Sequence, residues 1–248
     1  MTKDYFSVQS AAYRESRPTY PDAFFAWLAS IAPERHLAWD CGCGSGQATV
    51  GLANHFDRVI ATDLSANQIA QAPGVPNVEY RVEAGEATTL AAQSVDLTLV
   101  AQALHWFDLD AFYPEVHRVT RPGGVFVAIS YNFLEISPAL DVLVNRLYSD
   151  VLGAYWPPER RHVENGYRSL PFPFVRLPSY AGMLAADWDL AHLLRYFDSW
   201  SATAAYLRQT GVDPVAAMRD EFAAAWGNPS AVRRVAWPLT VHAGTVGG

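Results

Sequence analysis

The stretch Asp40-Cys41-Gly42-Cys43-Gly44-Ser45-Gly46 decides the fold, because it joins an apolar segment at 37–39 to a segment of helical periodicity at 48–56. Glycines let the backbone turn sharply and approach a ligand with no Cβ in the way. The N-terminus of the following helix offers unpaired N–H groups to negative charge. Asp63 lies 17 residues beyond Gly46, at the end of the next predicted strand, where a carboxylate can accept both hydroxyls of a ribose. This arrangement predicts a nucleotide-binding loop.

Strand and helix signals alternate on both sides of this loop. Apolar positions at helical spacing predict a helix that opens at Pro21-Asp22 and ends at Pro33. Strands are predicted at 37–39, 58–62, 78–82, 95–101 and 125–129, and helices at 48–56, after the capping residue Ser65, and at 109–120. Pro114 must kink the last of these helices or mark its true start. Strands with crossover helices in this order predict an α/β fold with a doubly wound, parallel sheet.

The rest of the chain has a different pattern. We expect a single domain over 1–248, with an N-terminal arm at 1–21, a nucleotide-binding core at 36–130, an elaboration at 131–230, and a final strand and tail at 231–248. The elaboration mixes aromatic residues and prolines with helical stretches. Asp213-Pro214 predicts the start of a helix whose apolar face holds Val215, Met218, Phe222 and Trp226.

The composition narrows the class of partner. The formal charge is −7 and the longest basic cluster is Arg160-Arg161-His162, whereas proteins that grip a phosphate backbone usually carry a basic face. We therefore expect a small-molecule ligand and no nucleic acid. No apolar run of 18 residues and no signal-peptide pattern is present, so we expect no membrane segment and a cytoplasmic protein. Cys41 and Cys43 suit neither a structural disulfide nor a four-ligand zinc site, and we expect no metal.

Two kinds of nucleotide cofactor could use the glycine loop. The dinucleotide fingerprint Gly-x-Gly-x-x-Gly needs its third glycine at residue 47 or 49, and those residues are Gln47 and Thr49. The tighter Gly-x-Gly-x-Gly with Asp40 in front resembles motif I of the class I S-adenosylmethionine-dependent methyltransferases. The resemblance implies S-adenosylmethionine as cofactor and S-adenosylhomocysteine as product. An NAD-linked oxidoreductase and a non-catalytic S-adenosylmethionine-binding protein stay open as alternatives.

The resemblance extends over residues 36–130. Residues 83–87 are similar to the family's adenine loop, 94–97 to the start of its fourth strand, and 118–124 to the turn into its fifth. It implies a Rossmann-like, mostly parallel sheet of seven strands with the last one antiparallel and helices on both faces. Ala84 stands where the family often has an acidic or hydroxyl residue, so backbone contacts at Ala84 and Gly85, or Glu86, must serve the adenine. The implied cofactor contacts are Tyr13, Arg17, Asp40, Gly42, Cys43, Gly44, Gly46, Asp63, Leu64, Ala84, Gly85, Glu86 and Gln102.

The segment Gln102-Ala103-Leu104-His105-Trp106-Phe107 follows the fourth strand, at the sheet edge where ligands bind. It lacks the Asn/Asp-Pro-Pro-aromatic motif of DNA and protein-amide methyltransferases. It resembles the small-molecule branch that includes trans-aconitate methyltransferase-like (type 11) proteins. The arm Tyr13-x-x-x-Arg17-Pro18-x-Tyr20-Pro21 resembles that branch too. We expect it to close over the cofactor as a lid, and the alternative is that Tyr13 and Arg17 only tie down the N-terminus. The C-terminal helical and aromatic elaboration is expected over the acceptor site.

The acceptor is expected to offer an oxygen, in a hydroxyl or a carboxylate. Methyl transfer from a sulfonium is an in-line displacement that mainly needs alignment, and a base is needed only if the acceptor arrives protonated. For a hydroxyl, His105 is the candidate catalytic base, and its alternative is a partly buried histidine bonded to backbone. For a carboxylate, Arg17, Arg14 or Arg195 could provide a cationic anchor. The candidate substrate-binding residues are Trp106, Tyr131 and Trp200.

Overall fold

The computed structural model describes residues 18–247, and its centre is a parallel sheet with the strand order β3-β2-β1-β4-β5. The strands are β1 (Leu37–Cys41), β2 (Arg58–Asp63), β3 (Val78–Val82), β4 (Val95–Ala101) and β5 (Thr120–Tyr131). The order runs outward from β1 in one direction through β2 and in the other through β4. Between β1 and β4 the sheet therefore has a topological switch point, where doubly wound folds bind their ligands. The glycine loop leaves β1 at this point.

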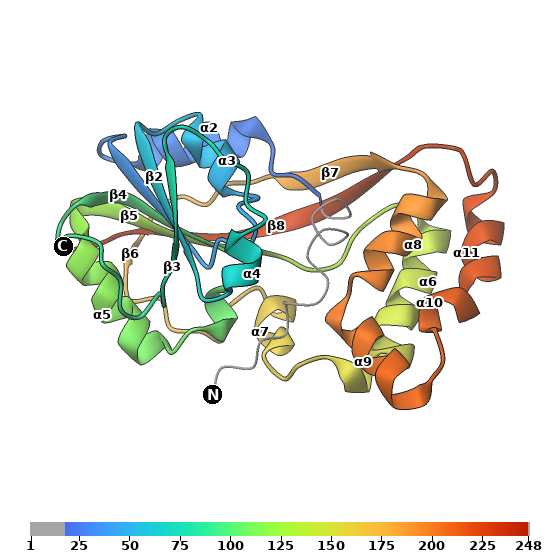
Figure 1. Ribbon diagram of the computed structural model, residues 1–248. Coiled ribbons are helices and arrows are strands. Elements are labelled where there is room, and N and C mark those ends of the chain that lie inside the picture. Colours follow the sequence, from blue (N-terminus) through green and yellow to red (C-terminus); the bar gives the residue numbers. More distant parts are fainter. Residues whose placement is uncertain (1–17, 248) are drawn as a thin grey trace.

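A long strand, β8 (Arg233–Thr245), extends the sheet antiparallel to β5, from Val125 opposite Thr245 to Tyr131 opposite Leu239. Two further strands pair with β8: β6 (Val175–Arg176) near its end and β7 (Met183–Trp188) near its beginning. In Figure 1, β8 runs in red from the parallel strands to a group of helices at the other end of the molecule. The expected mostly parallel Rossmann-like sheet with an antiparallel last strand is confirmed, and within residues 18–247 it has eight strands rather than seven.

No sequence pattern predicts strands β6 and β7. Strand β7 reads Met-Leu-Ala-Ala-Asp-Trp, in which leucine and alanine favour helix. It is extended because residues 183–188 pair one by one with 238–233 of β8. Such pairing depends on a partner about 50 residues away in sequence, which local propensity does not report.

Helices cover both faces of the parallel strands, as expected. Helices α2 (Asp22–Ile31) and α3 (Thr49–Ala53) pack on one face, where Phe24 and Leu28 meet the strand residues Val59 and Leu97. Helix α5 (Leu109–Val119) packs on the other face against Trp39, Ile60 and Phe126, which are all buried.

The observed helix boundaries agree only in part with those predicted from the sequence. Helix α2 spans the predicted residues, and Ser65 caps the short α4 (Ala66–Ile69) by accepting the Gln68 N–H at 3.3 Å. Helix α3 is shorter than the predicted 48–56. Helix α5 begins at Leu109 and continues across Pro114, so Pro114 does not mark its start.

A second group of helices lies at the far end of β7 and β8, away from α2, α3 and α5 (Figure 1). We call it the helical cap. Its members are α6 (Pro138–Asn145), the π-helical turn η2 (Arg146–Val151), η3 (Gly153–Tyr155), α8 (Leu190–Asp198), α9 (Ser201–Thr210), α10 (Pro214–Ala217) and α11 (Arg219–Trp226). One apolar cluster joins the cap to β7 and β8, and it includes Phe197 and Phe222 of the cap and Trp237 of β8.

The helix predicted after Asp213 forms as two pieces, α10 and α11, because Met218 leaves helical geometry (φ −102°, ψ 2°). Its predicted apolar face is nevertheless buried, and the Asp213 carboxylate caps α10 by accepting the N–H groups of Val215 and Ala216, both at 2.9 Å. No helix within residues 18–247 combines the length and apolar character needed to cross a membrane.

Candidate active site

The glycine loop is tied to the end of β2 by its own backbone. The N–H groups of Gly42 and Cys43 both donate to the Thr62 carbonyl, at 2.8 and 3.0 Å. Gly42, Gly44 and Gly46 have φ angles of 70°, 55° and 81°, in the left-handed region that favours glycine. The loop conformation therefore depends on all three glycines.

The three glycines differ in what a side chain would meet. A Cβ at Gly42 would lie 2.6 Å from the Ala103 Cβ, and one at Gly46 would lie 2.6 Å from the Tyr80 hydroxyl. At Gly44 the nearest atom is the Gln68 Oε1, 3.9 Å away. Gly42 and Gly46 are thus needed for packing within the protein, whereas the space beside Gly44 is open and lies next to a cavity.

Asp63 ends β2 beside this loop. One carboxylate oxygen accepts the Gly44 N–H and the other accepts the Ser65 N–H, both at 2.8 Å. Each carboxylate oxygen has about two lone-pair sites, so each retains one for a ligand hydroxyl. The side chain thus both fixes the loop and offers a bidentate acceptor to the cavity that it lines.

Asp40 lies near the end of β1 and is fully buried, with relative exposure of 0%. Its Oδ2 accepts the Thr49 hydroxyl at 2.6 Å, while its Oδ1 has no hydrogen-bond partner within residues 18–247. Burial raises the pKa of Asp40 to about 7; the Thr49 hydrogen bond lowers it and the charge of Asp63 raises it further. A buried carboxylate with an unused oxygen suits a cationic ligand group, whose charge would favour the ionised form.

A cavity of about 650 Å³ extends from the glycine loop to the helical cap. This size is typical of small-molecule sites. From the sheet side it is lined by Asp40, Gly42, Cys43, Gly44, Asp63, Gln102, His105, Trp106 and Tyr131, and from the other side by Trp156, Arg160, Tyr196, Trp200 and Arg208. Residues from opposite ends of the chain thus share one site.

Gln102 follows β4 and has a φ angle of 58°, which is uncommon for a residue other than glycine. Its N–H donates to the Ile129 carbonyl at 2.9 Å, and its side-chain amide donates to the Tyr131 carbonyl at 2.7 Å. These bonds to β5 hold a strained residue at the cavity wall. Such strain is found preferentially at functional sites.

His105 lies in the short helix η1 (Leu104–Trp106) after β4, and its Nδ1 is 3.0 Å from the Tyr167 hydroxyl. Burial lowers the pKa of His105 to about 3, with further lowering by the charges of Arg160 and His162, so the ring is neutral at ordinary pH. Tyr167 is only 2% exposed, and its hydroxyl hydrogen needs an acceptor, because an unpaired buried donor costs about 1–3 kcal/mol. His105 Nδ1 meets that need, which assigns the ring proton to Nε2.

The other residues predicted from the sequence divide into three groups. Trp106, Tyr131 and Trp200 line the cavity, and their role in substrate binding stays a prediction. Leu64, Ala84, Gly85 and Glu86 are not in its lining: Gly85 packs on Cys41 and Glu86 accepts the Asp108 N–H at 3.1 Å. Tyr13, Arg14 and Arg17 lie outside the described residues. Arg195 is exposed and does not line the cavity.

The sequence patterns do not assign Asn132, Trp156, Arg160, Tyr196 or Arg208 to the site. In the sequence, Arg160 stands out only as part of a short basic cluster. The structure places it in the first turn of α7 (Arg160–Glu164), which packs against η1. The local sequence does not predict that contact, because it is made between segments about 55 residues apart. No three His, Cys, Asp or Glu side chains gather as metal ligands within 18–247.

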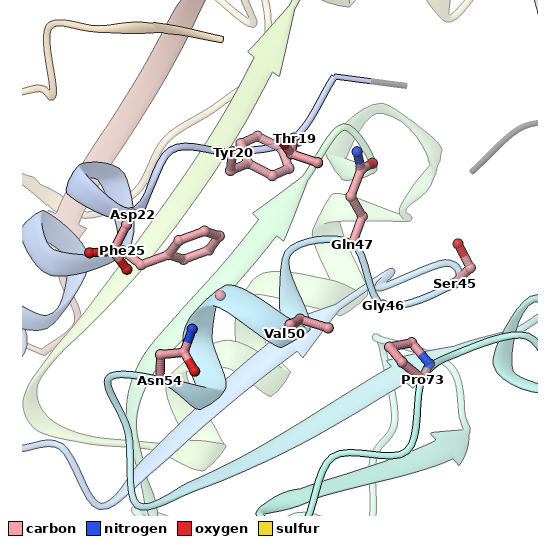
Figure 2. Close-up of a pocket in the computed structure, with 11 residues that line it drawn as sticks. Thr19, Tyr20, Asp22, Phe25, Ser45, Gly46, Gln47, Val50, Asn54 and Pro73 are labelled. Atoms are coloured by element: carbon pink, nitrogen blue, oxygen red, sulfur yellow. The ribbon is translucent and has the colours of Figure 1, made fainter. Parts of the chain in front are cut away.

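A second pocket, of about 470 Å³, lies on the outer side of the glycine loop. Figure 2 shows that Thr19, Tyr20, Asp22 and Phe25 border it from one side, with Gly46, Val50 and Asn54 on the other. Tyr20, Ser45 and Gln47 line both pockets. The Gln47 amide donates to the Pro18 carbonyl, which joins the loop to the segment before α2.

Comparison with known proteins shows the family to which this chain belongs. The family model described as a methyltransferase domain matches residues 39–128, from β1 into β5. A protein of Dictyostelium discoideum with the provisional name of methyltransferase is 37% identical over 214 residues, which cover 85% of this chain and 81% of its own. A solved structure from Anaeromyxobacter dehalogenans, provisionally named a type II methyltransferase, has 48% sequence identity and a TM-score of 0.89 over 93% of this chain and 98% of that chain. This chain belongs to the S-adenosylmethionine-dependent methyltransferases.

A third relative shares this family name. It is a provisionally named S-adenosylmethionine-dependent methyltransferase of Saccharomyces cerevisiae, 27% identical over 174 residues that cover 65% of this chain and 60% of its own. The alternatives of an NAD-linked oxidoreductase and of a non-catalytic binding protein are not favoured by these similarities.

The residues of the loop fit the cofactor. The orphaned Asp40 Oδ1 suits a cationic ligand, and S-adenosylmethionine carries both an ammonium and a sulfonium group. Asp63 retains an acceptor site on each oxygen for the two ribose hydroxyls, and the open space at Gly44 lets the chain of the ligand approach the backbone. When bound, the cofactor supplies an electrophilic methyl group.

Proposed function

We propose that the enzyme transfers the methyl group to an oxygen atom of a small-molecule acceptor, and that this oxygen belongs to a carboxylate. The observation that carries the proposal is the composition of the acceptor half of the cavity. From η1 to α9 the described lining contains aromatic side chains and two arginines, and no Asp, Glu, Lys or Cys. Apart from the hydroxyls of Tyr131 and Tyr196, His105 is the remaining candidate base, and its pKa of about 3 makes it a weak one.

A carboxylate needs no base, because it is already ionised at neutral pH. Its oxygen forms the new C–O bond while the electron pair of the C–S bond goes to sulfur. The carboxylate loses its charge, the sulfonium becomes a thioether, and no proton moves. The protein has to align the two reactants and exclude water, which walls of Trp106, Trp156 and Trp200 are suited to do. The resemblance to trans-aconitate methyltransferase-like proteins points to the same acceptor class.

A turnover panel tests the proposal. Carboxylic acids with aliphatic or aromatic bodies, including trans-aconitate, are compared with the matched primary alcohols and amines by following S-adenosylhomocysteine release. We expect turnover among the acids and none above background among the alcohols and amines. Turnover confined to alcohols or amines would contradict the carboxylate assignment.

A further inference from the structure

Arg160 is held in one orientation from several sides. Its Nε donates to the Tyr148 hydroxyl and its Nη2 to the Asn132 side-chain carbonyl, each at 2.8 Å. Its guanidinium carbon lies 5.1 Å from the ring centroid of Trp156 and 5.6 Å from that of Tyr148, within cation–π range. Trp156 is itself fixed, since its indole N–H donates to the Tyr148 carbonyl at 3.0 Å. The guanidinium is therefore pre-oriented at the cavity wall.

Its charge has no direct partner in the described part of the protein. No carboxylate within residues 18–247 lies within 4.0 Å of the Arg160 guanidinium. Other arginines do pair with acids: Arg58, Arg81, Arg118, Arg121 and Arg146. The exposed Glu164 is reached only through the Tyr148 hydroxyl, which donates to it at 2.6 Å. A guanidinium has five N–H donors, and the hydrogen bonds to Tyr148 and Asn132 use two of them.

Arg160 and His105 belong to neighbouring elements, because α7 packs against η1. With Nδ1 occupied by the Tyr167 hydroxyl, His105 offers an N–H donor at Nε2. This corner of the cavity therefore presents donors and a positive charge, with aromatic rings around them. Such a corner matches an anionic oxygen group attached to an apolar body.

We infer that Arg160 is the anion anchor of the acceptor site and the residue by which the enzyme selects carboxylates over neutral molecules of the same shape. Asn132 and Tyr148 act as positioning residues, because they hold the guanidinium. The inference rests on the proposed function for the identity of the acceptor, and it assigns the recognition to a residue of α7 rather than to the N-terminal arm.

The test measures binding, so it does not depend on turnover. The full chain is saturated with S-adenosylhomocysteine and titrated calorimetrically with phenylacetate and hexanoate and with their neutral analogues phenylacetamide and hexanamide. We expect the wild-type protein to prefer each carboxylate to its amide by about tenfold to a hundredfold, the usual range for hydrogen bonds to a charged group. Equal binding of acid and amide by the wild-type protein would overturn the inference.

Variants assign the preference to one residue. Arg160→Gln should bring the ratio of affinities for the acid and the amide to within about threefold of unity. Arg160→Lys keeps the charge but loses the bidentate geometry of the guanidinium, so its ratio should lie between those of the wild type and Arg160→Gln. The matched control is Arg161→Gln, because Arg161 is the next residue of α7, is exposed and does not line the cavity. It should behave like wild type, and both glutamine variants should keep the wild-type affinity for S-adenosylhomocysteine. An unchanged ratio in Arg160→Gln would refute the anchor.

Failure of the anchor and failure of the proposed function give different results. If the acids are turned over to methyl esters and Arg160→Gln keeps the wild-type ratio, the anchor is wrong and the function stands. If Arg160→Gln loses the preference while the methylated products are ethers or amines, the anchor stands and the methylated atom lies elsewhere on an anionic acceptor.

Discussion

The two halves of the cavity are built in different ways. On the sheet side, the loop after β1 is joined to the end of β2 within a short stretch of sequence, by backbone hydrogen bonds to the Thr62 carbonyl and by the Asp63 carboxylate, which accepts the Gly44 N–H. On the opposite side, side chains from α7, α8 and α9 reach the cavity. Helix α7 packs against η1, whereas α8 and α9 belong to the helical cap, so these segments come together only in the folded chain. The sheet side is therefore suited to hold the cofactor, and the opposite side is suited to select the acceptor.

The largest effect expected from this comparison is that of Gly44→Val. The side chain would fill the open space at the cavity, so cofactor binding should be lost in calorimetric titration with S-adenosylhomocysteine. A matched control is Gly211→Val, because Gly211 also has a positive φ angle, of 73°, and a Cβ at that position would have no atom within 4 Å. Both variants should lose about 1–3 kcal/mol of stability through backbone strain. Normal binding by folded Gly44→Val would show that the loop does not hold the cofactor.

Asp63→Ala should weaken S-adenosylhomocysteine binding by on the order of 2–4 kcal/mol, about 30-fold to 1,000-fold, because two charge-assisted bonds are lost. Asp57→Ala is the control, since Asp57 carries an exposed carboxylate that pairs with His36 at the surface. When Asp63→Ala is saturated with S-adenosylhomocysteine at a higher concentration, it should still prefer the acid to the amide as the wild-type protein does. An unchanged affinity in the folded variant would remove Asp63 from the cofactor site.

These two positions show what the sequence could predict. Gly44 and Asp63 belong to a pattern whose spacing follows from strand, turn and helix geometry, and the structure places both at the cavity. Arg160 could not be found in this way, because its place depends on the packing of α7 against η1. Trp156 and Tyr196 could not be found either, because their places depend on packing within the cap, where both rings lie against Trp200. The same limit applies to β7, a strand that exists through its pairing with β8.

A smaller effect is expected from pH. Because the pKa of Asp40 is raised to about 7 and a cationic ligand favours its ionised form, binding below pH 7 should release a proton. Affinity for S-adenosylmethionine should then fall by up to about tenfold per pH unit below 7. The raised pKa also means that the ligand-free protein loses stability as the pH rises from about 4 through 7.

Calorimetry in buffers of different ionisation heat measures the released proton directly. Asp40→Asn should abolish both the proton release and the pH dependence. Binding without proton release at pH 6 would show that Asp40 does not respond to the cofactor.

The smallest effect is expected at His105. With a pKa of about 3 the ring of His105 stays neutral, so the pH profile of kcat should show no inflection near pH 6.5. His105→Gln keeps a hydrogen-bond donor and should lower kcat by less than about tenfold. Tyr167→Phe, which removes the partner of Nδ1, should have an effect of similar size. A fall of about 10²–10⁴ in His105→Gln, the range typical of a lost general base, would point to a hydroxyl acceptor instead.

The carboxylate assignment is tested most directly by the chemical identity of the methylated product. The full chain is incubated with S-adenosylmethionine that carries a trideuterated methyl group and with the acid that gives the fastest turnover, and the product is analysed by mass spectrometry before and after mild alkali. We predict a labelled methyl ester, from which alkali releases all of the label as methanol. Label that resists alkali, as in an ether, an amine or a C-methyl product, would contradict methyl transfer to a carboxylate oxygen.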